Sequence, residues 1–157
     1  MIYIFSAFYA EAKNIIDHYD LKKEKSLETV RFDVFANDDI RLVITGVGEI
    51  NAAAAVSNIG GAYGISPDDE ILNVGCGACF SSENCLGSIF LGNKLTEQMT
   101  GRTFYPDMLM KTGYRECEII TAVRVLKEGR EQVVYDMEAA AIYQAAAFFV
   151  GPHRMHF

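Results

Sequence analysis

The chain has 157 residues and a mass of 17.4 kDa, which is enough for one domain with a hydrophobic core. Half of its residues are hydrophobic, which excludes a disordered chain, and its formal charge of -7 disfavours nucleic acid or an anionic membrane as a partner. No apolar run approaches a membrane span, and the apolar N-terminus lacks the basic segment of a signal peptide, so we expect a cytoplasmic protein.

Apolar runs that predict strands alternate with stretches that predict helices. In chain order the sequence predicts strand 2–6, helix 9–19, strands 30–36 and 40–45, helix 50–63, strands 70–75, 88–92 and 118–123, and helix 137–149. This alternation indicates an α/β sheet covered by helices. With no internal repeat or linker, we expect residues 1–157 to form a single domain.

Three turns after predicted strands carry residues suited to a ligand site. Residues 6–11 bring the carboxylate of Glu11 into a helix, residues 45–51 contain two glycines, and residues 75–78 form a tight turn rich in small residues. Ligands of α/β sheets gather where strands end, and glycines let the backbone approach them. Each segment alone can also be an ordinary turn. Residues 46–48 do not continue into the dinucleotide-binding pattern, because Asn51 stands where its third glycine should be.

Two acids stand at the start of the last predicted helix. Asp136 and Glu138 precede a segment, residues 139–150, in which only Tyr143 and Gln144 are polar. Carboxylates beside so apolar a helix need partners, which favours a functional role. The alternative is that they cap the free N–H groups of the helix and complement its dipole.

The cysteines offer a weaker alternative. Cys76, Cys79, Cys85 and Cys117 fit an intracellular protein as free thiols, although Cys76 and Cys79 form a C-x-x-C pair. A second pair to complete a zinc site is missing, and the motif follows a strand instead of opening a helix. A redox or metal protein therefore remains a minor alternative, and we expect no metal site.

Four segments together resemble a known family. They are Ala7 with Glu11, and residues 45–53, 73–78 and 136–142. Their order resembles the purine nucleoside phosphorylase/uridine phosphorylase superfamily and, within it, the methylthioadenosine/S-adenosylhomocysteine nucleosidases. The resemblance covers essentially the whole chain. It implies a three-layer α/β domain with a central mixed sheet flanked by helices, and cleavage of the N-glycosidic bond of a purine nucleoside through an oxocarbenium-like transition state.

The resemblance also implies roles for particular residues. Glu11 matches the family's water-activating carboxylate, and Glu138 matches the acid that accepts hydrogen bonds from the ribose hydroxyls. The strand end at residues 121–123 matches the part that meets the base. The remaining implied contacts with the sugar and base are Val47, Cys76, Gly77, Ala78, Asp136 and Met137. No cofactor is implied, and a homodimer is expected because the family builds its sites near subunit contacts.

The sequence favours water over phosphate as the nucleophile. Residues 6–11 contain no arginine, and Asn73 stands where related phosphorylases carry one. A phosphate site without a cation is poorly supported. A nucleoside phosphorylase remains the alternative.

The resemblance ends near the end of the chain. In the family, the helix after the Met-Glu pair leads to a buried strand with a Ser-Asp pair, whose aspartate assists the leaving purine, and then to a long helix. No Ser-Asp pair follows Glu138 here. We therefore expect a domain that lacks the last strand and helix and has weak or no activity. A degenerate member that only binds a nucleoside or adenine, or a site completed by another chain, is an alternative to truncation.

One loop departs from the nucleosidase pattern. Residues 100–107 contain glycine, proline and paired aromatic residues, which predict an ordered loop. Family loops in this region reach the 5′ end of the substrate, so Phe104, Tyr105 or Asp107 could select the 5′ group. The alternative is a packed surface loop.

Overall fold

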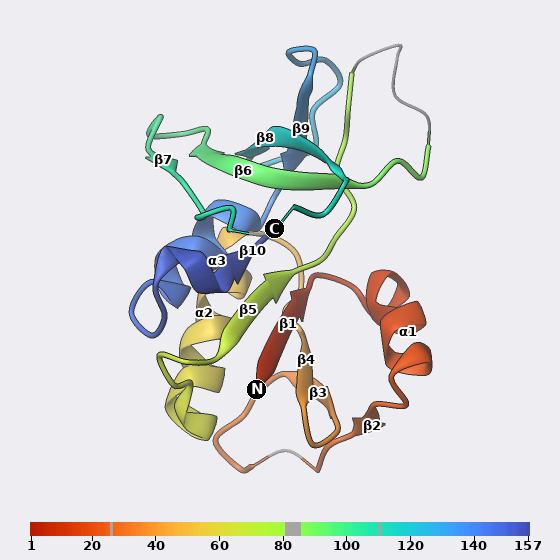
Figure 1. Cartoon of the computed structure of the whole chain (residues 1–157), viewed down its shortest axis with the longest axis vertical. Coiled ribbons are helices and arrows are strands. Elements are labelled where there is room, and N and C mark those ends of the chain that lie inside the picture. Colours follow the sequence, from red (N-terminus) through yellow and green to blue (C-terminus); the bar gives the residue numbers. More distant parts are fainter. Residues whose placement is uncertain (26, 81–85, 110) are drawn as a thin grey trace.

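The structure of the protein is a computed structural model that describes residues 1–25, 27–80, 86–109 and 111–157 (Figure 1). Within these residues the α-helices are α1 (Tyr9–His18), α2 (Glu49–Ile59) and α3 (Ala139–Ala146). The strands are β1 (Ile2–Ser6), β2 (Lys22–Lys23), β3 (Asp33–Ala36), β4 (Ile40–Ile44), β5 (Glu70–Asn73), β6 (Phe90–Glu97), β7 (Thr103–Phe104), β8 (Arg115–Thr121), β9 (Val133–Asp136) and β10 (Met155–His156).

The first sheet has the strand order β10-β5-β1-β4-β3-β2. β1 runs parallel to both β4 and β5, so Ile4 lies beside Leu42 and Leu72. β3 is antiparallel to β4 and to β2. The central strands are covered on both faces, which explains why their sequences are continuous apolar runs. Phe5, Leu42 and Val43 are fully buried there.

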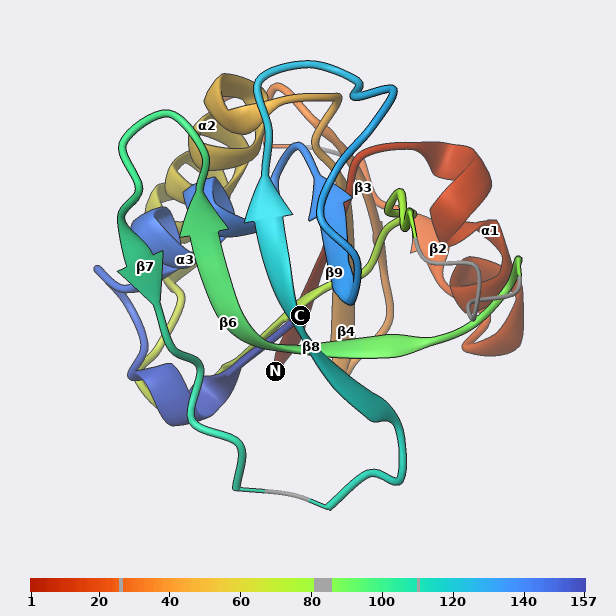
Figure 2. The same cartoon turned by 90° about the horizontal axis from the view of Figure 1, so that it is seen from above.

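The second sheet has the order β7-β6-β8-β9, and Figure 2 shows these strands side by side. β6, β8 and β9 are parallel, whereas β7 is antiparallel to β6. The two sheets meet at the last residues of the chain. β10 pairs with β5, and the carbonyl of Phe157 accepts a 2.7 Å hydrogen bond from the N–H of Gly92 in β6. The central mixed sheet expected from the sequence is therefore hydrogen-bonded as two sheets.

Helices cover both faces of the first sheet. Ile16 of α1 packs with Ile4 and Leu42 on one face. α2 and α3 pack on the other face, in a larger core shared with Leu95 and Ile119 of the second sheet. Figure 1 shows α1 on one side of β1, and α2 and α3 on the other. The predicted α/β class with flanking helices is confirmed. Among the described helices, none has the length and apolar character needed to cross a membrane.

The helix predicted at residues 137–149 is shorter in the structure. It begins at Ala139 and ends at Ala146, and residues 133–136 before it form the unpredicted strand β9. The chain leaves β9 at Asp136 and turns directly into α3. Asp136, Met137 and Glu138 therefore occupy a strand-to-helix turn, the position at which α/β proteins place ligand-binding residues.

Candidate active site

The carboxyl ends of the parallel strands bring the predicted segments together. β1, β4 and β5 end at neighbouring positions, Ser6, Ile44 and Asn73. The turn after β5 is hydrogen-bonded to Glu11, and the turn after β4 is hydrogen-bonded to Glu138. Residues far apart in the sequence thus line one region.

Glu11 connects the turns that follow β1 and β5. Its Oε1 accepts a hydrogen bond from the N–H of Cys76 at 3.0 Å. Its Oε2 accepts from the N–H of Phe8 at 3.2 Å and from the hydroxyl of Ser6 at 3.3 Å. The bond from Phe8 also caps α1. Three donors hold the side chain at the edge of the sheet, with lone pairs left for a further donor.

The glycine turn after β4 approaches Glu138 closely. Gly46 and Gly48 have φ values of 79° and 95°, a left-handed conformation that is costly for other residues. The N–H of Gly48, at the start of α2, donates a 2.7 Å hydrogen bond to Oε1 of Glu138. Val47 lies between the two glycines and is 37% exposed. The turn therefore supplies a backbone donor and an apolar side chain next to the carboxylate.

Asp136 serves as a cap for α3. It accepts hydrogen bonds from the Thr121 hydroxyl at 2.7 Å, the N–H of Ala139 at 2.6 Å and the N–H of Glu138 at 3.2 Å. Burial raises the pKa of Asp136, although these hydrogen bonds act in the opposite direction. The capping interpretation thus describes this acid. Asp136 fixes the backbone from which Glu138 extends.

Glu138 faces the other carboxylates. Its Oε2 accepts a 3.3 Å hydrogen bond from the N–H of Met137, and its Oε1 accepts the bond from Gly48. Burial raises the pKa of Glu138, and the negative charges of Asp136 and Glu11 act in the same direction. Glu11 and Glu138 are therefore close enough to interact electrostatically, although 127 positions separate them in the sequence.

The turn at Cys76, Gly77 and Ala78 runs against β9. Ala78 and Tyr135 exchange two backbone hydrogen bonds of 2.8 Å each. A Cβ added to Gly77 would lie 2.2 Å from the Val134 side chain, so only glycine fits this approach. The Glu11 carboxylate lies beside Cys76, where desolvation and this charge raise the pKa of the thiol. The turn therefore joins Glu11 to the strand that leads to Glu138.

Two further residues belong to this region: Thr121, in the strand end that the resemblance matches to the part that meets the base, and Glu49, which the sequence analysis did not single out. Thr121, at the end of β8, is fully buried, and its hydroxyl also accepts a 2.9 Å hydrogen bond from the N–H of Ala140. Glu49 lies in the first turn of α2, and burial raises its pKa, with the charges of Glu97 and Asp136 acting in the same direction.

The region is strongly acidic. Within the described residues, none of the ion pairs involves Glu11, Asp136 or Glu138. In the same part of the chain, no cluster of three or more His, Cys, Asp or Glu side chains could hold a metal ion. Cys76 and Cys117 are free thiols, and Cys85 lies outside the described residues.

Comparison with known proteins shows which solved structures have a similar fold. No protein-family model matches the sequence, and no curated protein matches it. The structure is similar to methylthioadenosine/S-adenosylhomocysteine nucleosidase from Neisseria meningitidis (TM-score 0.76, 17% identity, covering 94% of this chain and 79% of that one). S-adenosylhomocysteine nucleosidase from Streptococcus pyogenes gives 0.74 at 18% identity, covering 99% and 80%. A futalosine hydrolase mutant from Helicobacter pylori gives 0.75 at 11% identity, covering 99% and 86%.

The chain therefore has the α/β fold of nucleoside phosphorylase-like proteins. Within that class, its structure is similar to those of methylthioadenosine/S-adenosylhomocysteine nucleosidases, as the resemblance in the sequence predicts. At identities of 11–18% these likenesses show the fold alone, and the function must be argued from the site.

Proposed function

We propose that this chain is a nucleosidase-type hydrolase that cleaves the N-glycosidic bond of a purine nucleoside with a modified 5′ carbon, such as methylthioadenosine or S-adenosylhomocysteine. The observation that carries the proposal is that two carboxylates, Glu11 in α1 and Glu138 after β9, accept backbone hydrogen bonds from the turns that follow the parallel strands β5 and β4. The similar proteins from N. meningitidis and S. pyogenes were solved with methylthio-immucillin-A and 5-methylthiotubericidin, which supports this class of substrate.

The two carboxylates have complementary tasks. Glu11 takes a proton from water as positive charge grows on the sugar, and its own charge stabilises that sugar. Glu138 accepts hydrogen bonds from the ribose hydroxyls through the lone pairs that Gly48 and Met137 do not use. Orientation of sugar and water between them lowers the barrier by several kcal/mol, on the order of other proximity effects.

The neighbouring residues position the substrate. Cys76, Gly77 and Ala78 lie beside the base and ribose, while Val47 and Met137 provide apolar contacts. Asp136 acts through Glu138, because three hydrogen bonds tie its carboxylate to Thr121 and to the backbone at the start of α3.

Water is the nucleophile in this proposal. A phosphate dianion would meet Glu11, Asp136 and Glu138, and like charges at short range repel. The amide of Asn73 donates to the carbonyl of Phe5 at 3.2 Å and carries no charge to attract phosphate. A nucleoside phosphorylase is the less favoured reaction.

A nucleoside-binding protein without catalysis is the second candidate function. The sequence has no Ser-Asp pair after Glu138 to assist the departing purine. A positioned acid contributes about 10²–10⁴-fold to such reactions, so catalysis by this chain is weak or lost. Ribose binding through Glu138 does not need that acid and would persist.

The proposed assembly is a cytoplasmic homodimer. An apolar groove of about 380 Å³ lies between α2 and α3 and is lined in part by Ile50, Ala53 and Phe148. Ile50 and Phe148 are 86% and 87% exposed, and so large an apolar surface favours a contact with a second copy. The Tyr105 side chain is 57% exposed, which leaves it available to select the 5′ group together with Phe104 and Asp107.

The test is base release from methylthioadenosine, S-adenosylhomocysteine, adenosine and inosine in phosphate-free buffer, with the sugar product identified. We expect slow release of base with free sugar, reduced about 10²-fold or more in Glu11→Gln. Glu28→Gln removes an exposed carboxylate elsewhere and should leave the rate unchanged. Release that requires phosphate would indicate a phosphorylase, and binding without release would indicate the second candidate function.

A further inference from the structure

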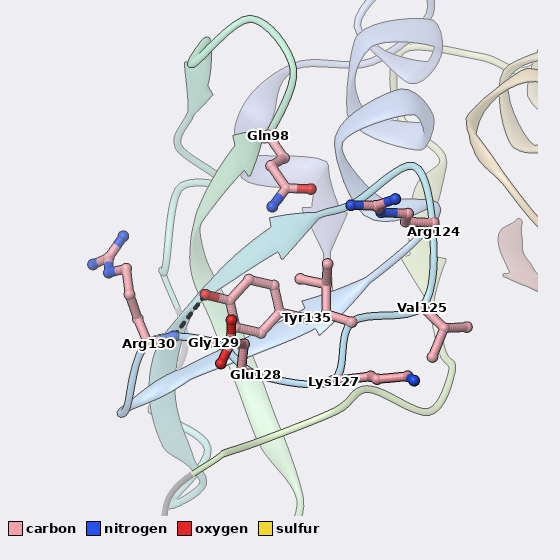
Figure 3. Close-up of a pocket in the computed structure, with 9 residues that line it drawn as sticks. Gln98, Arg124, Val125, Lys127, Glu128, Gly129, Arg130 and Tyr135 are labelled. Carbon is pink, nitrogen blue, oxygen red and sulfur yellow. Dashed lines mark hydrogen bonds between the residues drawn. The ribbon is translucent and has the colours of Figure 1, made fainter.

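The second sheet has a hollow on the face that points away from α2 and α3. Its volume is about 990 Å³, and it is bounded by Gln98 after β6, by the loop from Arg124 to Arg130, and by Tyr135 of β9 (Figure 3). A volume of this size suits a small molecule. No residue that we assign to the nucleoside site lines it.

The strand β9 separates this hollow from the carboxylates. Successive side chains of a strand point to opposite faces, so Tyr135 faces the hollow and Asp136 faces the other side. The core contacts agree, because Tyr135 packs with Val133 and Ile120, whereas Val134 packs in the large core with α2 and α3. The hollow is therefore a separate site behind the sheet.

The loop that forms the rim is anchored to the sheet. The Tyr135 hydroxyl accepts a 2.9 Å hydrogen bond from the N–H of Arg130, and the Arg130 guanidinium is 3.1 Å from Glu118. Gly129 lies so close to the rings of Tyr135 and Phe80 that an added Cβ would be 2.6–2.7 Å from them. These contacts hold the rim in place without a ligand.

The side chains at the rim form a donor site in an otherwise acidic protein. Figure 3 shows the Arg124 guanidinium and the Gln98 amide pointing toward each other across the hollow, with the Tyr135 ring below them. Arg130 is balanced by Glu118, but within the described residues neither Arg124 nor Lys127 forms an ion pair. Among the described residues that line the hollow, Glu128 is the one with a carboxylate.

We propose that this hollow binds a small phosphate monoester, with Arg124 and Gln98 donating hydrogen bonds to the phosphate oxygens. The planar guanidinium matches two oxygens of a phosphate group, and Lys127 adds charge for a dianion. Val125 and Leu126, which also line the hollow, provide an apolar surface for the body of the ligand. The proposal is independent of the nucleosidase activity, because the two sites share no side chain.

The test uses phenyl phosphate as the probe, with phenol and benzoate as the neutral and carboxylate counterparts, in calorimetric titrations of the full chain. We expect phenyl phosphate to bind more tightly than either counterpart. Arg124→Gln should weaken its binding by about tenfold or more, as expected for loss of a charge-assisted pair. Arg31→Gln, which removes an arginine beside α2, should leave the affinity unchanged.

Three results would overturn the proposal. They are failure of the wild-type chain to bind phenyl phosphate, equal binding of phenol or benzoate, and unchanged affinity in Arg124→Gln. A loss of phenyl phosphate binding in Glu138→Gln as large as in Arg124→Gln would also overturn it, since the ligand would then occupy the nucleoside site. The thermal unfolding midpoint of Arg124→Gln, an exposed position, verifies that the variant is folded.

Discussion

The two faces of β9 carry sites of opposite charge. On the inner side, Asp136 leads into Glu138, and with Glu11 these residues form an acidic region whose oxygens accept hydrogen bonds from tight turns. On the outer side, Tyr135 lies under a rim that carries Arg124 and Lys127. The comparison teaches that one short strand, by alternating its side chains, can separate a region suited to a growing positive charge from a region suited to an anion.

In the inner region, the two acids next to α3 differ in their hydrogen bonds, and we propose different roles for them. Asp136 holds the start of α3 through three hydrogen bonds, whereas Glu138 accepts two backbone hydrogen bonds and has lone pairs available for a ligand. The following predictions test these divisions, beginning with the largest expected effect on free energy.

Replacing Asp136 with alanine should lower the free energy of unfolding by about 2–4 kcal/mol, because the helix cap is lost and buried donors are left unpaired. Asp136→Asn keeps an acceptor oxygen and should cost less. Chemical denaturation of the wild type, Asp136→Ala and Asp136→Asn measures these differences in the free energy of unfolding. A fully stable Asp136→Ala protein that no longer binds nucleoside would make Asp136 a binding residue and break the distinction from Glu138.

Glu138→Gln should weaken nucleoside binding by about 10–100-fold, the equivalent of one or two charge-assisted hydrogen bonds. The titration compares methylthioadenosine with its 2′,3′-dideoxy analogue, in a Glu11→Gln background so that no substrate is consumed. We expect Glu11→Gln alone to prefer the hydroxylated ligand, and the preference to vanish when Glu138→Gln is added. A preference that survives would show that another group holds the ribose.

The smallest effect is a dependence of stability on pH. Because burial raises the pKa of Glu138 in the folded state, its contribution to stability is fully present below the unfolded pKa of about 4.3 and is lost as pH rises through the folded value. The neutral variant Glu138→Gln avoids this loss. Its unfolding free energy relative to wild type should therefore increase between pH 4 and pH 7, and a flat or falling difference would contradict the assigned environment.

The α/β class and most of the inner region could be predicted from the sequence. The first strand is predicted at its observed bounds, because a continuous apolar run between turns has few other interpretations. The turns with Gly46, Gly48 and Gly77 are visible as glycines because their backbone shapes or close approaches need them. Backbone constraints of this kind can be recognised in the sequence, because they require glycine at particular positions.

Other features of the fold and of the site could not be predicted from the sequence. β9 has only four residues after a polar loop, too few for the alternation of Val133 and Tyr135 to stand out. The two sheets meet at β10, a two-residue strand whose pairing with β5 is a long-range contact. The outer hollow comes from a loop whose arginines and lysine have no diagnostic spacing. The different roles proposed for Asp136 and Glu138 could not be predicted, because they follow from hydrogen bonds that only the folded chain shows.

The measurement that tests the central claim most directly is the rate of adenine release from methylthioadenosine by the wild-type chain and by Glu11→Gln, in the absence of phosphate. The account predicts slow but measurable release by the wild type and a rate at least about 100-fold lower in the variant. Equal rates in the two proteins would show that Glu11 does not activate the water and would contradict the proposed site.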